Sequence, residues 1–533
     1  MNNMFCYQCE QTMGGRGCSI SGVCGKSPET AAAQDTLTTE LVRLASTLKA
    51  RGAPLDGQTA ALFREGLFTC VTNVSFDTAR ILALAKKVSA TNGWMSGGSS
   101  STNFTLSDIW REPEDFRSLK SALLFGLRGM AAYAYHAAAL GETDPSVDAF
   151  FVEGLSVLAE DRKPDYLCAE LKRLGHINYR CMEMLDHANT SAFGDPTMTE
   201  VSRTIEPGPF IVVTGHDLKD LSELLEATDG TGVNVYTHGE MLPAHGYPKL
   251  RAHRQLRGNF GNAWQDQQQE FEYIPAPILW TTNCLMLPRE SYADKVWTTN
   301  TVGFPGAHVI GERDGKKDFG PLIAAAKAAK GWKEPKTFTG VNGGRKLVTG
   351  CGWKSALKLV PKISELVRQG RIGGFMLVGG CDGAKAGRSV FTDIVKNAPK
   401  DRIVITLACG KYRFNDLDLG EIDGIPRLLD FGQCNDAYGA IQFASALANV
   451  FGCGINELPL EFVISWYEQK AVAVLLTLLA LEIRKHPAGS DSSRIRLAER
   501  LQDARRQTRS QPRLTVSGSW RSAPGRTAGD AGQ

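Results

Sequence analysis

Apolar residues recur at helical spacing through roughly the first third of the chain. Apolar positions at i, i+3 and i+4, with few β-branched runs, occur in residues 30–50, 121–139 and 147–174. Segments rich in Gly, Ser and Pro, such as residues 92–101, separate these stretches. The pattern therefore predicts a helix-bundle region that extends from Ser27 to about Ala192.

After residues 206–209 the pattern changes to short apolar runs with helical segments between them. The runs that we interpret as strands are residues 210–213, 233–236, 278–280, 347–350, 375–378, 403–407 and 428–431. Alternating strands and helices are typical of doubly wound α/β folds with parallel sheets. We therefore predict a multidomain α + α/β protein, in which a helix-bundle domain precedes two Rossmann-like α/β domains. The predicted division is 1–200, 201–340, 341–484 and a divergent tail, 485–533.

A potential metal ligand follows each of six predicted strands. These residues are His216, Glu240, Cys284, Cys381, Cys409 and Cys434. The carboxyl ends of parallel strands meet at one edge of a sheet, where α/β proteins bind ligands. A lone cysteine or histidine there is usually a packing residue, but six equivalent positions favour a shared site. Soft thiolates are the ligands that iron–sulfur clusters require.

The pattern alone does not decide whether two further residues are metal ligands. Cys351 follows Gly350 and fits the same strand-end spacing. Glu468 lies just before the apolar segment 471–481, so burying it unpaired would be costly. Glu468 therefore either pairs with Lys470 and solvent or binds a metal.

Four cysteines are grouped near the amino terminus. Cys6, Cys9, Cys18 and Cys24 are separated by two, eight and five residues, with glycines between them. Such a group can hold structural zinc, form a redox disulfide or bind an iron–sulfur cluster. Zinc sites usually contain two tight cysteine pairs, whereas only Cys6 and Cys9 form one here. The spacing favours a cluster.

The composition sets limits on the class of protein. The chain has 533 residues, a formal net charge of +3 and 13 cysteines. This charge gives no indication of a nucleic-acid partner. The amino terminus lacks a basic segment followed by an apolar one, and the longest apolar run, 471–481, is too short to cross a bilayer. We expect a cytoplasmic protein with reduced thiols, and neither a nucleic-acid nor a membrane partner.

Several stretches together closely resemble the hybrid-cluster proteins, which are also called prismane proteins or hydroxylamine reductases. The resemblance extends from Met4 to about Arg484. It is carried by FCYQCEQT, GHDL, THGEMLPAHGYP, TTNC, GGCDGA, ACG, GQCNDAYGA and SWYEQKAV. These segments include Cys6, Cys9, the six strand-end candidates and Glu468, with Cys18 and Cys24 shortly after the first segment, but not Cys351. The resemblance implies that Cys351 is not a ligand.

The resemblance also implies two cofactors. A cubane 4Fe-4S cluster would be bound by Cys6, Cys9, Cys18 and Cys24. A hybrid 4Fe-2S-2O cluster, at the interface of the two α/β domains, would be bound by His216, Glu240, Cys284, Cys381, Cys409, Cys434 and Glu468, with Cys381 as a persulfide. The implied reaction is the reduction of hydroxylamine to ammonia, and also of nitric oxide to nitrous oxide. An NADH-dependent flavin and iron–sulfur reductase is the implied electron donor. We expect His238, His245 and Lys470 to supply protons, because N–O cleavage consumes them.

Two other classes of function are compatible with these residues. One is a non-catalytic redox protein, such as an electron carrier, a nitric-oxide sensor or a trans-nitrosylase. The other is an enzyme similar to carbon monoxide dehydrogenase, which would need nickel. The segment after Arg484 departs from the family pattern, because it is rich in Arg, Ser and Gly, and we expect it to be disordered or weakly helical. Loss of packing there would affect the site at Glu468.

Overall fold

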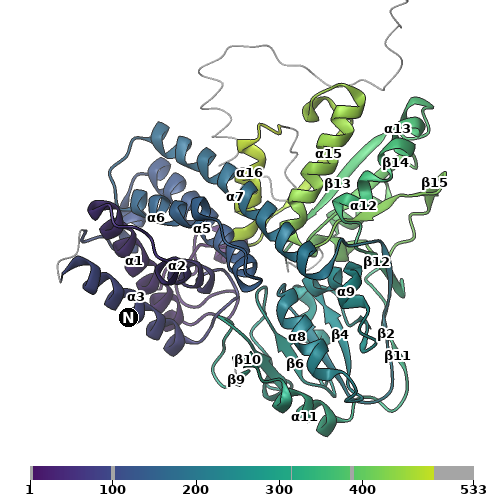
Figure 1. Ribbon diagram of the computed structural model, residues 1–533, viewed down its shortest axis with the longest axis horizontal. Helices are drawn as coiled ribbons and strands as arrows, with labels where there is room; N and C mark the ends of the chain where they lie inside the picture. The colour runs from purple at the N-terminus through teal and green to yellow at the C-terminus, as the bar shows by residue number, and fades with distance from the viewer. Residues whose placement is uncertain (1–3, 98–101, 314, 384–388, 485–533) are drawn as a thin grey trace, which may run out of the picture.

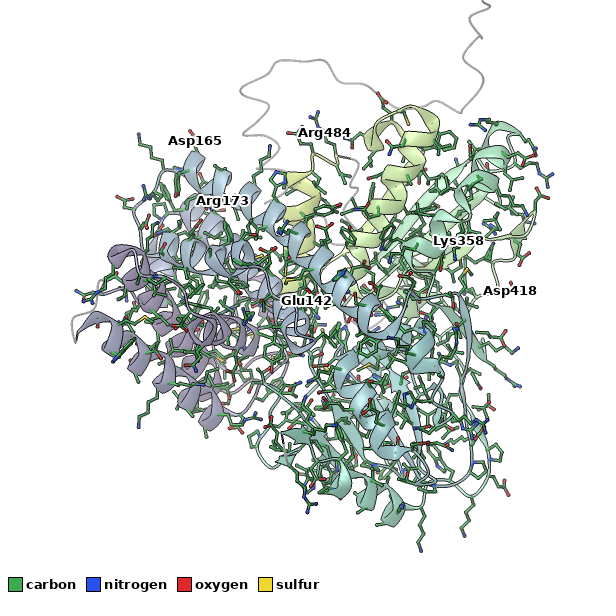
Figure 2. The ribbon with its side chains drawn as sticks, in the orientation of Figure 1. Glu142, Asp165, Arg173, Lys358, Asp418 and Arg484 are labelled. Carbon is green, nitrogen blue, oxygen red and sulfur yellow. The ribbon has the colours of Figure 1, made fainter. Side chains whose placement is uncertain are left out.

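The computed structural model describes residues 4–97, 102–313, 315–383 and 389–484. A helical region is followed by two parallel α/β regions, which lie beside it and beside each other (Figure 1). Charged side chains project from the periphery, as Asp165 does on the helical region and Lys358 and Asp418 do on the second α/β region (Figure 2). The predicted tail, 485–533, lies outside the described residues.

The helical region contains the elements that the apolar periodicity predicts, with one correction. Its helices are α1 (Pro28–Arg51), α2 (Gly57–Thr69), α3 (Thr78–Ser96), α4 (Leu106–Arg111), α5 (Glu114–Ala139), α6 (Pro145–Leu158) and α7 (Pro164–Phe193). The expectation of one helix through residues 147–174 is wrong, because α6 ends at Leu158. Lys163 precedes Pro164 and has an extended backbone (ψ 152°), which a residue before proline prefers, so α7 begins as a new helix.

The first α/β region contains a six-stranded parallel sheet. Its strand order is β5 (Leu256–Asn259), β4 (Asn234–His238), β3 (Phe210–Thr214), β6 (Ile278–Trp280), β7 (Val296–Thr298) and β8 (His308–Val309). The connecting helices include α8 (Leu218–Thr228), α9 (Pro248–Arg251), α10 (Gln267–Glu270) and α11 (Gly320–Ala329). Every residue of β3 is buried, as expected for a strand covered on both faces.

The second α/β region contains a four-stranded parallel sheet. Its order is β17 (Leu428–Asp430), β14 (Arg402–Thr406), β13 (Gly374–Gly380) and β18 (Leu460–Ser465). Its helices are α12 (Trp353–Leu357), α13 (Val360–Arg368), α14 (Val390–Lys396) and α15 (Ala437–Phe451). The edge strand β18 did not emerge from the sequence pattern.

Short antiparallel pairs join the two α/β regions. β1 (Thr199–Ser202) pairs with β12 (Lys346–Thr349), and β2 (Thr204–Ile205) pairs with β11 (Lys336–Thr337). The other two-stranded pairs are β9 (Glu312–Arg313) with β10 (Lys316–Lys317), and β15 (Glu421–Ile422) with β16 (Ile425–Pro426). The interpretation of residues 347–350 as the first strand of the second parallel sheet is therefore wrong, since β12 pairs with β1 instead.

The last described helix, α16 (Gln469–Ala480), returns to the helical region and packs on α5 and α7 (Figure 1). Gly175 of α7 permits this close approach, because a Cβ there would lie 2.2 Å from the carbonyl oxygen of Leu476. Asn178 donates a hydrogen bond to Thr477 Oγ1 at 2.9 Å across the same contact. Consequently α16 connects β18 to the helices. None of the described helices is both long enough and apolar enough to span a bilayer.

Candidate metal centre

Seven candidate ligands follow seven parallel strands. His216, Glu240 and Cys284 come after the neighbouring strands β3, β4 and β6, whereas Cys381, Cys409 and Cys434 come after the neighbouring strands β13, β14 and β17. Glu468 follows β18, the strand missing from the prediction, and caps the amino terminus of α16. All seven are buried. Glu468 thus belongs to the same strand-end series as the other six.

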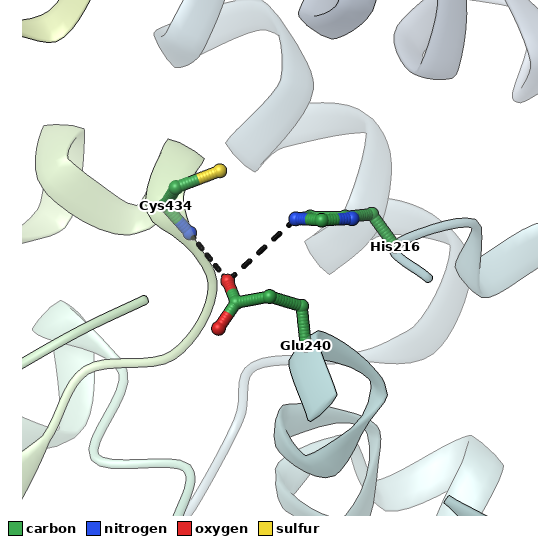
Figure 3. Close-up of side chains that lie close together, drawn as sticks. All are labelled: His216, Glu240 and Cys434. Atoms are coloured by element: carbon green, nitrogen blue, oxygen red, sulfur yellow. Dashed lines mark hydrogen bonds and ion pairs between the residues drawn. The ribbon is translucent and has the colours of Figure 1, made fainter. Parts of the chain in front are cut away.

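The closest group among these residues joins the two sheets. One ligand atom each from His216, Glu240 and Cys434 lies within 4.8 Å of the others (Figure 3). His216 Nε2 lies 3.7 Å from Glu240 Oε2, which also accepts a hydrogen bond from the Cys434 backbone N–H at 3.1 Å. The Gln433 side chain donates to the carbonyl oxygens of His216 (3.1 Å) and Glu240 (2.8 Å). Gln433 therefore positions the ligand loops of both sheets against each other.

The other strand-end thiols lie in one apolar cluster. Cys284, Cys381 and Cys409 pack there with Trp264 and Tyr467, among others, and the partly buried Cys9 packs against the cluster. Burial raises the pKa of the Cys381 thiol, as does Glu468, while hydrogen bonds from the backbone of Glu468 and Tyr467 lower it. The Asn283 amide donates to Cys284 Sγ at 3.4 Å.

Lys470 places a buried ammonium group inside this site. Its Nζ lies 3.0 Å from His216 Nε2, 3.0 Å from Asn283 Oδ1 and 3.7 Å from Glu468 Oε1. Burial opposes the charge of Lys470, but Cys434, Glu468 and Cys284 outweigh it and raise its pKa. For His216, burial and the adjacent Lys470 lower the pKa well below its usual value. His216 is therefore neutral, the form that binds a metal.

The buried carboxyl and thiol groups of this site are suited to binding a cationic group. Burial raises the pKa of both carboxyls, Glu240 and Glu468, and raises that of the Cys434 thiol to about 11. Within the described part of the chain, Glu240 Oε1 is buried without a hydrogen-bond partner. So many anionic donors, buried together with one lysine, ionise readily only around metal ions. Thiolate, imidazole and carboxylate donors in one place suit iron in a sulfur-rich cluster.

The amino-terminal cysteines form a second group. Cys6 and Cys18 pair through their backbones (N–O 3.0 and 2.7 Å), and Cys18 Sγ accepts a hydrogen bond from Met13 N–H at 3.4 Å. Burial raises the pKa of the Cys9 thiol, and Cys24 and Cys6 raise it further, which places these groups within electrostatic reach of one another. All 13 cysteines are free thiols in this structure. Lys26 Nζ lies 4.0 Å from Cys6 Sγ.

The two predicted proton-supplying histidines have other polar partners. His238 contacts Thr214 Oγ1 through Nδ1 and Glu270 Oε2 through Nε2, each at 3.0 Å. His245 Nε2 lies 3.1 Å from Thr237 Oγ1 and 3.2 Å from the Gly258 carbonyl oxygen. Burial lowers the pKa of His245 to about 4, so its ring carries no extra proton at neutral pH. Among the three predicted groups, Lys470 contacts the candidate ligands directly.

These features define a protein of the iron–sulfur type, because they combine donors at the strand ends of two parallel sheets with a group of amino-terminal cysteines. The model of the Prismane/CO dehydrogenase family matches residues 4–491, so the chain belongs to this family. Membership implies iron–sulfur clusters.

Known relatives are similar in sequence to this chain over nearly its whole length. A hydroxylamine reductase of Maridesulfovibrio salexigens is 46% identical over 503 residues, or 90% of this chain and 92% of the relative. A hydroxylamine reductase of Solidesulfovibrio magneticus is 46% identical over 508 residues, with the same shares. The nickel-free carbon monoxide dehydrogenase from Thermococcus sp. AM4 has a similar fold, with a TM-score of 0.52 at 15% identity over 95% of this chain and 91% of that one.

Proposed function

We propose that this protein is a hydroxylamine reductase with two iron–sulfur clusters. A 4Fe-4S cluster is held by Cys6, Cys9, Cys18 and Cys24. A hybrid 4Fe-2S-2O cluster is held by His216, Glu240, Cys284, Cys381, Cys409, Cys434 and Glu468, with Cys381 as a persulfide. The observation that carries the proposal is the convergence of buried sulfur, nitrogen and oxygen donors at the strand ends of both sheets.

The reaction joins hydroxylamine, two electrons and two protons to give ammonia and water. The bound hybrid cluster supplies the electrons and an iron position that is not closed by four thiolates. Lys470 presents a charged N–H donor beside His216, where it can hydrogen-bond a small N–O substrate and give up a proton. His238 and His245 stay candidates for relaying protons towards it. The same site would reduce two molecules of nitric oxide to nitrous oxide and water.

Several further assignments belong to this proposal. The hybrid cluster lies at the interface of two Rossmann-like domains, 201–340 and 341–484, which follow the helical domain 1–200. The protein works in the cytoplasm, with a small-molecule substrate and no nucleic-acid or membrane partner. Its electron donor is an NADH-dependent flavin and iron–sulfur reductase.

Turnover of hydroxylamine tests the proposal. Anaerobically purified protein with a reduced dye should produce ammonia, and Glu240→Gln should abolish this activity by removing an anionic ligand. Protein that contains both clusters but does not consume hydroxylamine would instead be a non-catalytic redox protein. The fold shared with carbon monoxide dehydrogenase makes the nickel content a necessary control. Bound nickel with oxidation of carbon monoxide would favour that enzyme.

A further inference from the structure

An apolar groove lies between the second parallel sheet and the helices α15 and α16 (Figure 1). Its volume, counted out to its open side, is about 980 Å³. Ile483, which directly precedes the last described residue, lines this groove as well. Each wall contributes large apolar side chains, among them Phe375 and Leu377 of β13, Ile441 and Leu447 of α15, and Val474 and Leu478 of α16.

The two helices that form the walls have very apolar sequences. α15 contains no charged residue, and the only one in α16 is Lys470, which contacts His216 instead. Leu377, Val474 and Leu475 line the groove and are only partly buried. A helix that is apolar on all sides normally packs against protein on all sides. The described residues therefore leave this groove without an element that covers it.

The rest of the chain is attached at this groove, because residues 485–533 follow directly after the described part. Part of this segment has helical periodicity, with four apolar residues that form one stripe, Leu497, Ala498, Leu501 and Ala504. Ser492 is a suitable N-cap before the stripe, and Pro512 lies beyond it. The pattern therefore predicts one amphipathic helix over residues 493–506.

The connection to this predicted helix is long enough to reach the whole groove. Residues 484–492 span up to about 30 Å when extended, and a helix over 493–506 is about 21 Å long. Pro487 and Gly489 favour a turn in the connection, so the chain can reverse its direction there. An isolated helix of this length is marginal in water. It gains stability when its apolar stripe is buried against another apolar surface.

We propose that residues 493–506 of this chain dock as an amphipathic helix in the groove between α15 and α16. The stripe of Leu497, Ala498, Leu501 and Ala504 faces the groove, and the opposite side of the helix, with Arg496, Glu499 and Asp503, faces solvent. Cys381 and Cys434 line the inner end of the groove. The docked helix thus separates two strand-end thiols from solvent. This inference requires no bound cluster, so it stands apart from the proposed function.

Hydrogen–deuterium exchange of the full-length protein, resolved by peptide, tests the inference. In the wild type, the amides of residues 493–506 should exchange about tenfold or more slowly than those of residues 513–533, because helical hydrogen bonds protect them. Leu501→Asp places a charge in the apolar stripe, so it should remove this protection and speed exchange in α15 and α16. A chain that ends at Arg484 should show the same faster exchange in both helices.

The matched control is Gln502→Asp. It introduces the same charge one residue further along, outside the apolar stripe, and should keep the wild-type exchange pattern. Fast exchange throughout residues 485–533 of the wild type, or protection that survives Leu501→Asp, would overturn the inference. The molar mass of each sample is measured by light scattering at several concentrations. Protection that appears only together with a dimer would assign the groove to a second copy of the chain and would also overturn the inference.

Discussion

Replacing Lys411 should reveal how strongly a buried ion pair holds two ligand loops together. Lys411 lies in the 3-10 turn η5 (Cys409–Arg413), and its Nζ contacts Asp430 Oδ1 and the Gly432 carbonyl oxygen, each at 2.7 Å. Both charged side chains are completely inaccessible to solvent. Asp430 Oδ1 also accepts the Gly432 N–H at 3.0 Å, two residues before Cys434. The pair therefore connects the Cys409 loop to the Cys434 loop.

Lys411→Met leaves the Asp430 carboxylate buried without its cation. Removing one partner of a buried ion pair costs about 3–5 kcal/mol, whereas replacing both partners with uncharged groups is often nearly neutral. We therefore expect Lys411→Met to lower the free energy of unfolding by about 3–5 kcal/mol. The double variant Lys411→Met/Asp430→Asn should recover most of that loss.

The assay is urea denaturation of iron-free protein, followed by both fluorescence and circular dichroism so that coincident transitions can be verified. Iron loading is measured in parallel, and Lys411→Met should load the strand-end site poorly. A loss below about 1 kcal/mol, the scale of exposed ion pairs, would refute the reasoning. So would a double variant that is as unstable as the single one.

Three other predictions concern individual residues. The pKa of His245 is about 4 in the folded protein. Because the unfolded value is near 6.5, the unfolded chain takes up the proton first, and stability should fall by up to roughly 3 kcal/mol as the pH drops from about 6.5 to about 4. His245→Gln should flatten this slope in denaturation curves measured across that pH range, and an unchanged slope would contradict the assignment. Lys26→Met removes a buried positive charge next to Cys6, so it should lower the reduction potential of the amino-terminal cluster in an EPR-monitored titration. A potential equal to that of the wild type would argue against a charge effect. Cys351→Ala should keep the full iron content, since Cys351 follows β12 outside the parallel sheet, whereas Cys434→Ala should lose strand-end iron; equal losses would make Cys351 a ligand.

Much of the architecture could be predicted because apolar runs mark buried strands directly. The runs before His216, Glu240 and Cys284 all became adjacent parallel strands, so their carboxyl ends meet at one sheet edge. The apolar pattern did not assign Glu468 in the same way, because the exposed, charged Glu461 interrupts the apolar run of β18 after its first residue. The local signal for this strand is the run 460–464 (LEFVI), which directly precedes SWYEQK.

Other parts of the site depend on contacts that no local pattern encodes. Gln433 and Asn283 are neutral polar residues whose importance comes from partners far away in the chain, such as His216 for Gln433 and Lys470 for Asn283. The break between α6 and α7 falls in the charged stretch 160–163, directly before Pro164, and these residues are the local signal for two separate helices. Strand β12 was misplaced because its pairing with β1 spans about 150 residues of sequence. In each case a long-range contact or a single proline decided the structure.

The most direct test for two clusters is the iron and acid-labile sulfide content per chain, with an EPR spectrum, of protein purified without oxygen. A chain that holds both proposed clusters should contain about eight irons and give signals from two distinct four-iron clusters. About four irons with only a cubane-like signal would contradict the two-cluster assignment, because the strand-end donors would then hold no cluster.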